Sequence, residues 1–383
     1  MKQKYFILLF NAITAIKIFM AILLIIFWQG KITADSNSFH AHAVGYITNS
    51  GNRMWGPLLR ALDSVGLYNR QGVTLLLLVL SFFVIPYLAA RISSLPTVPR
   101  EKQAFRGAFL LVALYPTLFI FSLDVFRDVF MVFCFLLALL PAKAFFESEK
   151  KVTWQNVVAL FLFVALCRFN YSLRPYLGFA LFWSFFICLF FSFAHHSLIF
   201  LSVAPLCALW GFRALGFLEP LLNYRKLFAL YSPNAGTNLG IAFDSIALFP
   251  LDFAKSALFQ LFGLFFVNIT SIFVFCLEGI PFFCGLIYLF KNRRAGSKFV
   301  DYLITFFFLY NSIWIIANDN LGTAVRIRIF SYITVLISCM IVYQRKQMLQ
   351  ESLPRKKVPF FMTRLLILRK SNLAVNVQEA SKC

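Results

Sequence analysis

Five arginines occupy the ends of long apolar stretches, where a charged side chain is costly. They are Arg127, Arg168, Arg174, Arg326 and Arg328. A charge at a membrane boundary must snorkel, pair or line a wet cavity. The planar guanidinium stays charged and binds phosphate with two parallel hydrogen bonds. We therefore expect these arginines to converge on a phosphate-bearing anion. The alternative is a structural one, in which Asp124, Arg127 and Asp128 pair with each other or with Arg168.

An acid beside such a cluster could serve as a general base. Asp35 lies a few residues beyond the first apolar stretch, in a segment that also carries His40 and His42. A carboxylate there could deprotonate a hydroxyl at the membrane surface, or it could only cap a helix. Asp124 is the competing candidate. The two histidines are two positions apart, so on a helix they face different directions and do not make a metal pair.

Two further charged residues are additional candidates for the functional site. Arg225 precedes a stretch at 231–240 that is rich in Gly and Asn, residues that permit close approach of a ligand. Glu278 lies within or at the end of an apolar stretch and needs a partner. No motif identifies a metal or a cofactor, and a requirement for a divalent metal is left open.

The composition indicates which structural elements position these residues. Of 383 residues 61% are hydrophobic and 13% are charged, with a net charge of +21 and a mean hydropathy of +0.79. The apolar residues fall into blocks, most of them long enough to cross a bilayer as helices. These blocks lie at about 5–28, 73–92, 107–123, 129–146, 156–168, 175–194, 197–212, 271–290, 300–318 and 328–343. We expect an all-α, polytopic transmembrane bundle of about ten spans, together with a re-entrant or interfacial piece at 257–270.

The distribution of Lys and Arg predicts the orientation. With both termini in the cytoplasm, the larger share of the 36 Lys and Arg falls on the cytoplasmic side. Residues 1–343 then form the bundle, with two long extracytoplasmic loops at 29–72 and 213–270. Residues 344–383 form a basic cytoplasmic tail with an amphipathic piece at Pro359–Lys370. No nucleic-acid-binding motif accompanies the positive charge, so anionic membrane lipids are its expected partners.

Four strings resemble the polytopic polymerases and glycosyltransferases of bacterial surface polysaccharide, the Wzy-like and GT-C-like membrane enzymes. The strings lie at 34–39, 115–128, 173–176 and 320–328. The spacing from Arg225 to Gly236 also fits the R-x10-G pattern of Wzy-like loops. An early acidic residue is similar to the loop Asp that serves as base in the GT-C relatives.

The resemblance implies an enzyme of the bacterial inner membrane that acts in O-antigen, capsule or other lipopolysaccharide or exopolysaccharide synthesis. It would join saccharide units carried on polyprenyl diphosphate at the periplasmic face. The sequence has no Walker motif, G-x-S-x-G or H-E-x-x-H, so a donor already activated on a lipid is expected. Whether the protein has a partner that regulates the length of the polysaccharide is left open. The main alternative is a flippase of lipid-linked oligosaccharide or another transporter. A further alternative is a membrane acyltransferase that uses His195 and His196.

Overall fold

The computed structural model describes most of the chain as helix. It describes residues 3–28, 34–47, 54–95, 101–148, 153–190, 198–231, 237–266 and 268–351. Within these ranges there is no β-strand, and the one isolated bridge pairs Asn238 with Asn320. The prediction of an all-α protein is confirmed. Pro359–Lys370, Gly236, His195 and His196 lie outside the described residues.

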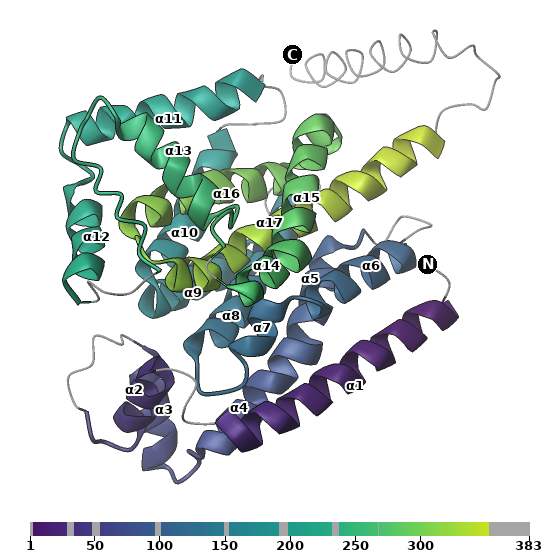
Figure 1. The fold of residues 1–383 in the computed structure, drawn as a ribbon. Coiled ribbons are helices and arrows are strands. Elements are labelled where there is room, and N and C mark those ends of the chain that lie inside the picture. Colours follow the sequence, from purple (N-terminus) through teal and green to yellow (C-terminus); the bar gives the residue numbers. More distant parts are fainter. Residues whose placement is uncertain are drawn as a thin grey trace. The chain divides into compact units, whose positions relative to one another are not determined.

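The helices are numbered along the chain (Figure 1). They are α1 (Gln3–Trp28), α2 (Ala34–Ala43), α3 (Trp55–Ser64), α4 (Arg70–Val79), α5 (Ile85–Ser93), α6 (Glu101–Ala113), α7 (Pro116–Ile120), α8 (Arg127–Glu147), α9 (Trp154–Leu173), α10 (Pro175–Phe190), α11 (Leu198–Ala214), α12 (Glu219–Tyr231), α13 (Phe249–Gln260), α14 (Ile269–Val274), α15 (Ile280–Asn292), α16 (Lys298–Ala317) and α17 (Leu321–Glu351), with π-helical turns η1 (Leu80–Val84) and η3 (Phe275–Gly279) and a 3-10 turn η4 (Arg293–Ala295).

Seven helical segments of the described residues are long and apolar enough to cross a membrane. They are Lys4–Leu24, Arg70–Ser93, Arg127–Glu147, Trp154–Leu173, Ile269–Ala295, Lys298–Ala317 and Leu321–Gln350. A pair bent by 84°, Ala204–Ala214 with Glu219–Leu227, would bring the number to eight. The chain is thus an α-helical membrane protein.

The three other predicted blocks fall on shorter or broken helices. The block at 107–123 is divided between α6 and α7, α10 is a shorter apolar helix, and the block at 197–212 belongs to the bent pair. A total of about ten spans therefore stays a prediction. The two segments predicted as long loops also carry helices of their own, namely α2 and α3 in the first and α12 and α13 in the second.

Polar caps and prolines in the sequence set several helix boundaries. The Asn69 side chain accepts the backbone N–H of Gln71 at 2.9 Å and so begins α4, and the Ser297 side chain caps α16 in the same way. Pro86 and Pro281 each follow a π-helical turn inside a long apolar segment. Since proline has no N–H to donate, the widened turn lets the helix continue past it.

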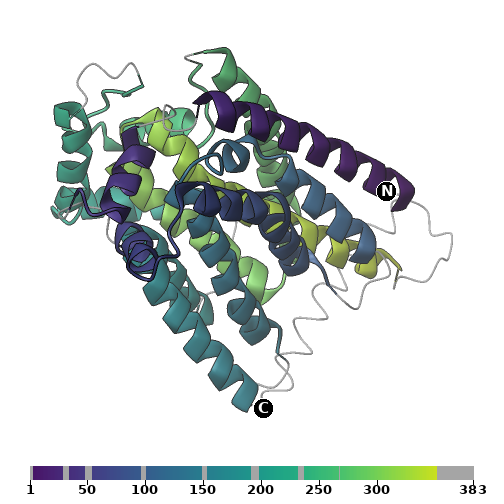
Figure 2. The same ribbon diagram turned by 90° about the horizontal axis from the view of Figure 1, so that it is seen from below.

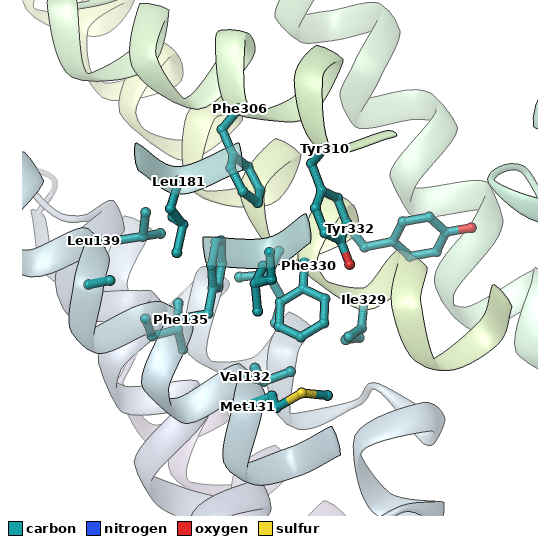
Figure 3. Packing of buried hydrophobic residues seen from close by; sticks show 14 of the residues in the cluster. Met131, Val132, Phe135, Leu139, Leu181, Phe306, Tyr310, Ile329, Phe330 and Tyr332 are labelled. Atoms are coloured by element: carbon teal, nitrogen blue, oxygen red, sulfur yellow. The ribbon is translucent and has the colours of Figure 1, made fainter. Parts of the chain in front are cut away.

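The core of the bundle lies where α8, α16 and α17 meet. The rings of Phe135 and Phe306 are 5.2 Å apart between centroids, and those of Phe135 and Phe330 are 5.4 Å apart. Figure 3 shows these rings converging with that of Tyr310, whereas the Tyr332 ring points away from them. By contrast, α1 lies along the edge of the bundle (Figures 1 and 2) and is only 6% buried along its apolar window. Its exposed Leu and Ile side chains therefore face lipid rather than protein.

Candidate functional site

One cavity brings together four of the residues that the sequence singles out. It has a volume of about 420 Å³, and Asp35, Arg127, Arg174 and Arg326 contribute to its wall. Tyr176, Tyr224, Asn318 and Thr323 also line it. The four charged residues come from α2, the start of α8, the α9–α10 junction and the start of α17. The cavity thus places these four chain segments at the same end of the bundle.

The Asp35 carboxylate forms an ion pair with Arg326, whose Nη1 donates to Asp35 Oδ2. The Asp35 side chain is 54% exposed and that of Arg326 is 18% exposed. The Arg326 guanidinium also stacks over the rings of Phe121 and Phe126, with its Cζ 4.8 and 5.4 Å from the centroids. Arg326 is therefore fixed by aromatic contacts, whereas Asp35 keeps contact with solvent.

Arg174 and Arg127 have unused hydrogen-bonding capacity. Arg174 is buried between α9 and α10, and its nearest carboxylate oxygen, on Asp128, is 3.9 Å from Nη2, too far for a hydrogen bond. Its Nη1 has no hydrogen-bond partner among the described residues. Arg127 stacks over Phe39 at 5.9 Å and forms no ion pair within the described part of the chain. Both guanidiniums can therefore bind an anion that enters the cavity.

The tight junction of α9 and α10 explains the position of Arg174. A Cβ at Gly178 would collide with the backbone of Cys167 and Tyr171, so only glycine lets α10 approach α9 this closely. Arg174 is the residue between the two helices, and Pro175 begins α10. Its side chain leaves the backbone at the sharp turn and reaches the cavity.

The other predicted arginines do not share this cavity. Arg168 is largely exposed, and its Nη1 donates to Ser172 Oγ at 2.6 Å on the same helix. Arg328 is buried and lines a different cavity, on the opposite side of α17. Arg225 is buried, forms an ion pair with Asp319 and donates to the carbonyls of Ile241 and Ile315 at 2.5 and 3.0 Å. It holds the segments on either side of the cavity together.

Asp124, the other candidate for the base, does not line the cavity of Asp35. Asp124 is fully buried, and its two oxygens accept from Arg70 Nε at 2.8 Å and Nη2 at 2.6 Å. Burial alone would raise the pKa of Asp124, but the hydrogen bonds from Arg70 and the Val125 backbone N–H hold the pKa below its usual range. Arg70 also donates to Asn37 on α2 at 2.9 Å. Asp124 thus joins α2, α4 and the segment before Arg127.

Glu278 lies inside the bundle, away from Asp35. Its two oxygens accept from the N–H and the hydroxyl of Thr117, both at 2.7 Å. No group of three or more His, Cys, Asp or Glu that could hold a metal is present among the described residues.

Several residues in or near the cavity were not singled out from the sequence. Arg70 and Asp319, which do not line it, have their ion-pair partners 54 and 94 positions away in the chain. Tyr224 and Asn318 belong to segments with no recognisable motif. Of these residues, only Arg70 carried a signal in the sequence, because its positive charge falls on the extracytoplasmic side of the predicted topology.

The fold and the site together define an α-helical membrane protein with a cationic cavity that holds one partly exposed carboxylate. Comparisons of the chain with models of protein families, with curated proteins and with solved structures find no match. What the site does must therefore be inferred from its chemistry.

Proposed function

We propose that the protein is a membrane glycosyltransferase or polysaccharide polymerase that uses saccharide carried on a polyprenyl diphosphate. The observation that carries the proposal is the placement of Asp35 in one cavity with Arg127, Arg174 and Arg326. Three guanidiniums and one half-exposed carboxylate are the groups that diphosphate departure and hydroxyl deprotonation require. The proposal includes about ten spans, cytoplasmic termini and a periplasmic active face in a bacterial inner membrane.

The arginines would bind the diphosphate of the donor. Among the described residues, Arg174 Nη1 has no hydrogen-bond partner and Arg127 forms no ion pair. The planar fork of each matches two phosphate oxygens. As the bond between the anomeric carbon and the phosphate oxygen breaks, its electron pair stays on the lipid diphosphate. The fixed guanidiniums stabilise that added charge without having to reorganise.

Asp35 would act on the acceptor. Its carboxylate takes the proton of an acceptor hydroxyl while the hydroxyl oxygen forms the new bond to the anomeric carbon. The ion pair with Arg326 holds the carboxylate at the wall of the cavity that the arginines line. Since the Asp35 side chain is half exposed, the proton can then pass to water. Asp124 is held by Arg70 outside the cavity, so we assign the role of base to Asp35 alone.

The test is a transfer assay with the purified protein in lipid nanodiscs. Polyprenyl-diphosphate-linked saccharide is supplied, and longer saccharide and released polyprenyl diphosphate are measured. We expect both products from the wild type, and at least about a hundredfold less from Asp35→Asn, because a general base contributes about 10²–10⁴-fold. Asp244→Asn, which changes an exposed acid outside the cavity, is the control. In proteoliposomes, movement of the lipid-linked saccharide across the bilayer without any longer product would instead indicate the flippase.

A further inference from the structure

The first turns of α17 separate two cavities. Thr323, Arg326 and Ile327 face the cavity of Asp35, whereas Ala324, Val325 and Arg328 face a second cavity of about 260 Å³. Arg326 and Arg328 are two positions apart, which turns their side chains about 200° from each other on an α-helix. One short stretch of helix thus presents a guanidinium to each cavity.

Arg328 is built into the wall of the second cavity but lacks a partner there. The residue is 4% exposed, and its Nε has no hydrogen-bond partner among the described residues. Its guanidinium lies 5.3 Å from the centre of the Tyr332 ring and against Gly263, where a Cβ would collide with it. The Tyr332 hydroxyl donates to the Leu261 carbonyl at 2.8 Å and fixes this turn. Arg328 is therefore held in place by packing, with donors left for a ligand.

The charges near the cavity do not balance within the protein. Glu278 is the acid whose charge interacts with Arg328, and Lys17 interacts with the same acid. Both oxygens of Glu278 already accept hydrogen bonds from Thr117, and within the described residues neither cation forms an ion pair with it. Two cations thus face one carboxylate, which leaves a net positive charge inside the bundle. An anion would balance that charge.

The remaining walls indicate the kind of anion. Apart from Arg328 and a few amides and hydroxyls, the cavity is lined by apolar side chains such as Ile120, Phe259 and Val274. Phe265 lines it and is also exposed, and Phe266 and Ile269 beside it are exposed as well. Because the candidate span Ile269–Ala295 begins here and the segment 257–270 is the one expected at the membrane interface, we take these side chains to contact lipid. An entering molecule would therefore arrive from the bilayer, with an apolar chain and an anionic head.

We infer that the Arg328 cavity is a second binding site, separate from that of Asp35, for the phosphate head and first chain segment of a membrane lipid. The binding itself does not depend on the proposed glycosyl transfer. If that transfer holds, two lipid sites on either side of α17 would accommodate the two lipid-linked substrates that a polymerase joins. This assignment of roles, unlike the binding, rests on the proposed function.

The test counts bound farnesyl phosphate by native mass spectrometry of the detergent-solubilised protein. The variants are Arg328→Gln, Val325→Trp, which fills the cavity without removing a charge, and Arg326→Gln in the other cavity. We expect two bound molecules for the wild type and one for each variant, with affinity at the lost site reduced roughly tenfold or more. Farnesol, which has no phosphate, should not bind in an Arg328-dependent way. Unchanged thermal unfolding midpoints establish that the variants are folded.

The possible outcomes separate the two proposals. Unchanged binding in both Arg328→Gln and Val325→Trp overturns the second site. Displacement of farnesyl phosphate by equimolar inorganic phosphate would show a free-anion site and overturn the assignment to a lipid, as would equal binding of farnesol. Unchanged binding in Arg326→Gln alone would instead count against the proposed function and leave the second site standing.

Discussion

Arg326 on α17 forms an ion pair with Asp35 on α2 across 291 positions of the chain. The pair links a helix of the bundle core to a short helix outside the candidate spans, and both residues line the same cavity. In the proposed reaction the pair holds the base beside the diphosphate. Exchange of either residue should therefore affect catalysis more than folding, since an exposed ion pair contributes only about 0–1 kcal/mol to stability.

Arg326→Lys tests that relationship. Lys keeps a positive charge near Asp35 but loses the stacking of a planar group on Phe121 and Phe126 and the two-pronged phosphate contact. We expect transfer to fall roughly tenfold or more while the thermal unfolding midpoint changes by no more than a few degrees. Full transfer activity in Arg326→Lys would mean that the residue supplies only charge.

Asp124→Asn should affect stability instead of chemistry. The carboxylate is buried and accepts two hydrogen bonds from Arg70, so loss of its charge should lower the free energy of unfolding by roughly 1–3 kcal/mol. The folded protein should retain its transfer activity. Unfolding in detergent and activity per folded molecule are the two measurements. A stable but inactive Asp124→Asn would make Asp124 the better candidate for the base.

The same residue gives a pH dependence of known sign. Because the pKa of Asp124 is lower in the folded than in the unfolded protein, its stabilising contribution is complete above about pH 4 and is lost as the pH falls through the folded pKa. The difference in unfolding midpoint between the wild type and Asp124→Asn should therefore be constant from pH 7 to 5 and shrink below about pH 4. A difference that does not change down to pH 3 contradicts the role of the Asp124 charge.

Arg225→Ala should lower the amount of folded protein. The guanidinium is buried and binds Asp319 and several backbone carbonyls, which would all lose this donor. Breaking a buried pair costs about 3–5 kcal/mol. The neighbouring Lys226→Ala, at an exposed position, is the control and should express normally. Normal folding and activity of Arg225→Ala would refute this structural role.

The sequence predicts the helices of this protein better than it predicts the partners of its charges. Apolar blocks depend on local composition, so the described parts of the ten predicted blocks are mostly helical. An ion pair such as Arg70–Asp124 depends on how distant helices pack, which no local pattern records. The five arginines were singled out because they lie at the ends of apolar blocks, and three of the five line the Asp35 cavity. The spacing of Arg326 and Arg328 already implied opposite faces of one helix and could have separated these two residues.

Orientation in the membrane can be measured independently of activity. Reporter fusions ending near Asn69 and Leu239 should report the periplasm, and those near Ser148 and Lys298 the cytoplasm, because Lys and Arg are more abundant on the second set of connections. A cytoplasmic signal at Leu239 would contradict both the predicted number of spans and the placement of the cavity on the periplasmic side.

The most direct test of the central claim compares Arg174→Lys with Arg168→Lys in the binding of a polyprenyl diphosphate. Both arginines lie at the same end of α9, but only Arg174 lines the Asp35 cavity, and its Nη1 has no hydrogen-bond partner in the described part of the chain. The account predicts that Arg174→Lys raises the Kd roughly tenfold or more while Arg168→Lys leaves it unchanged, both variants being folded. Equal affinities for the wild type and Arg174→Lys, or an equal loss in both variants, would contradict a diphosphate site in this cavity.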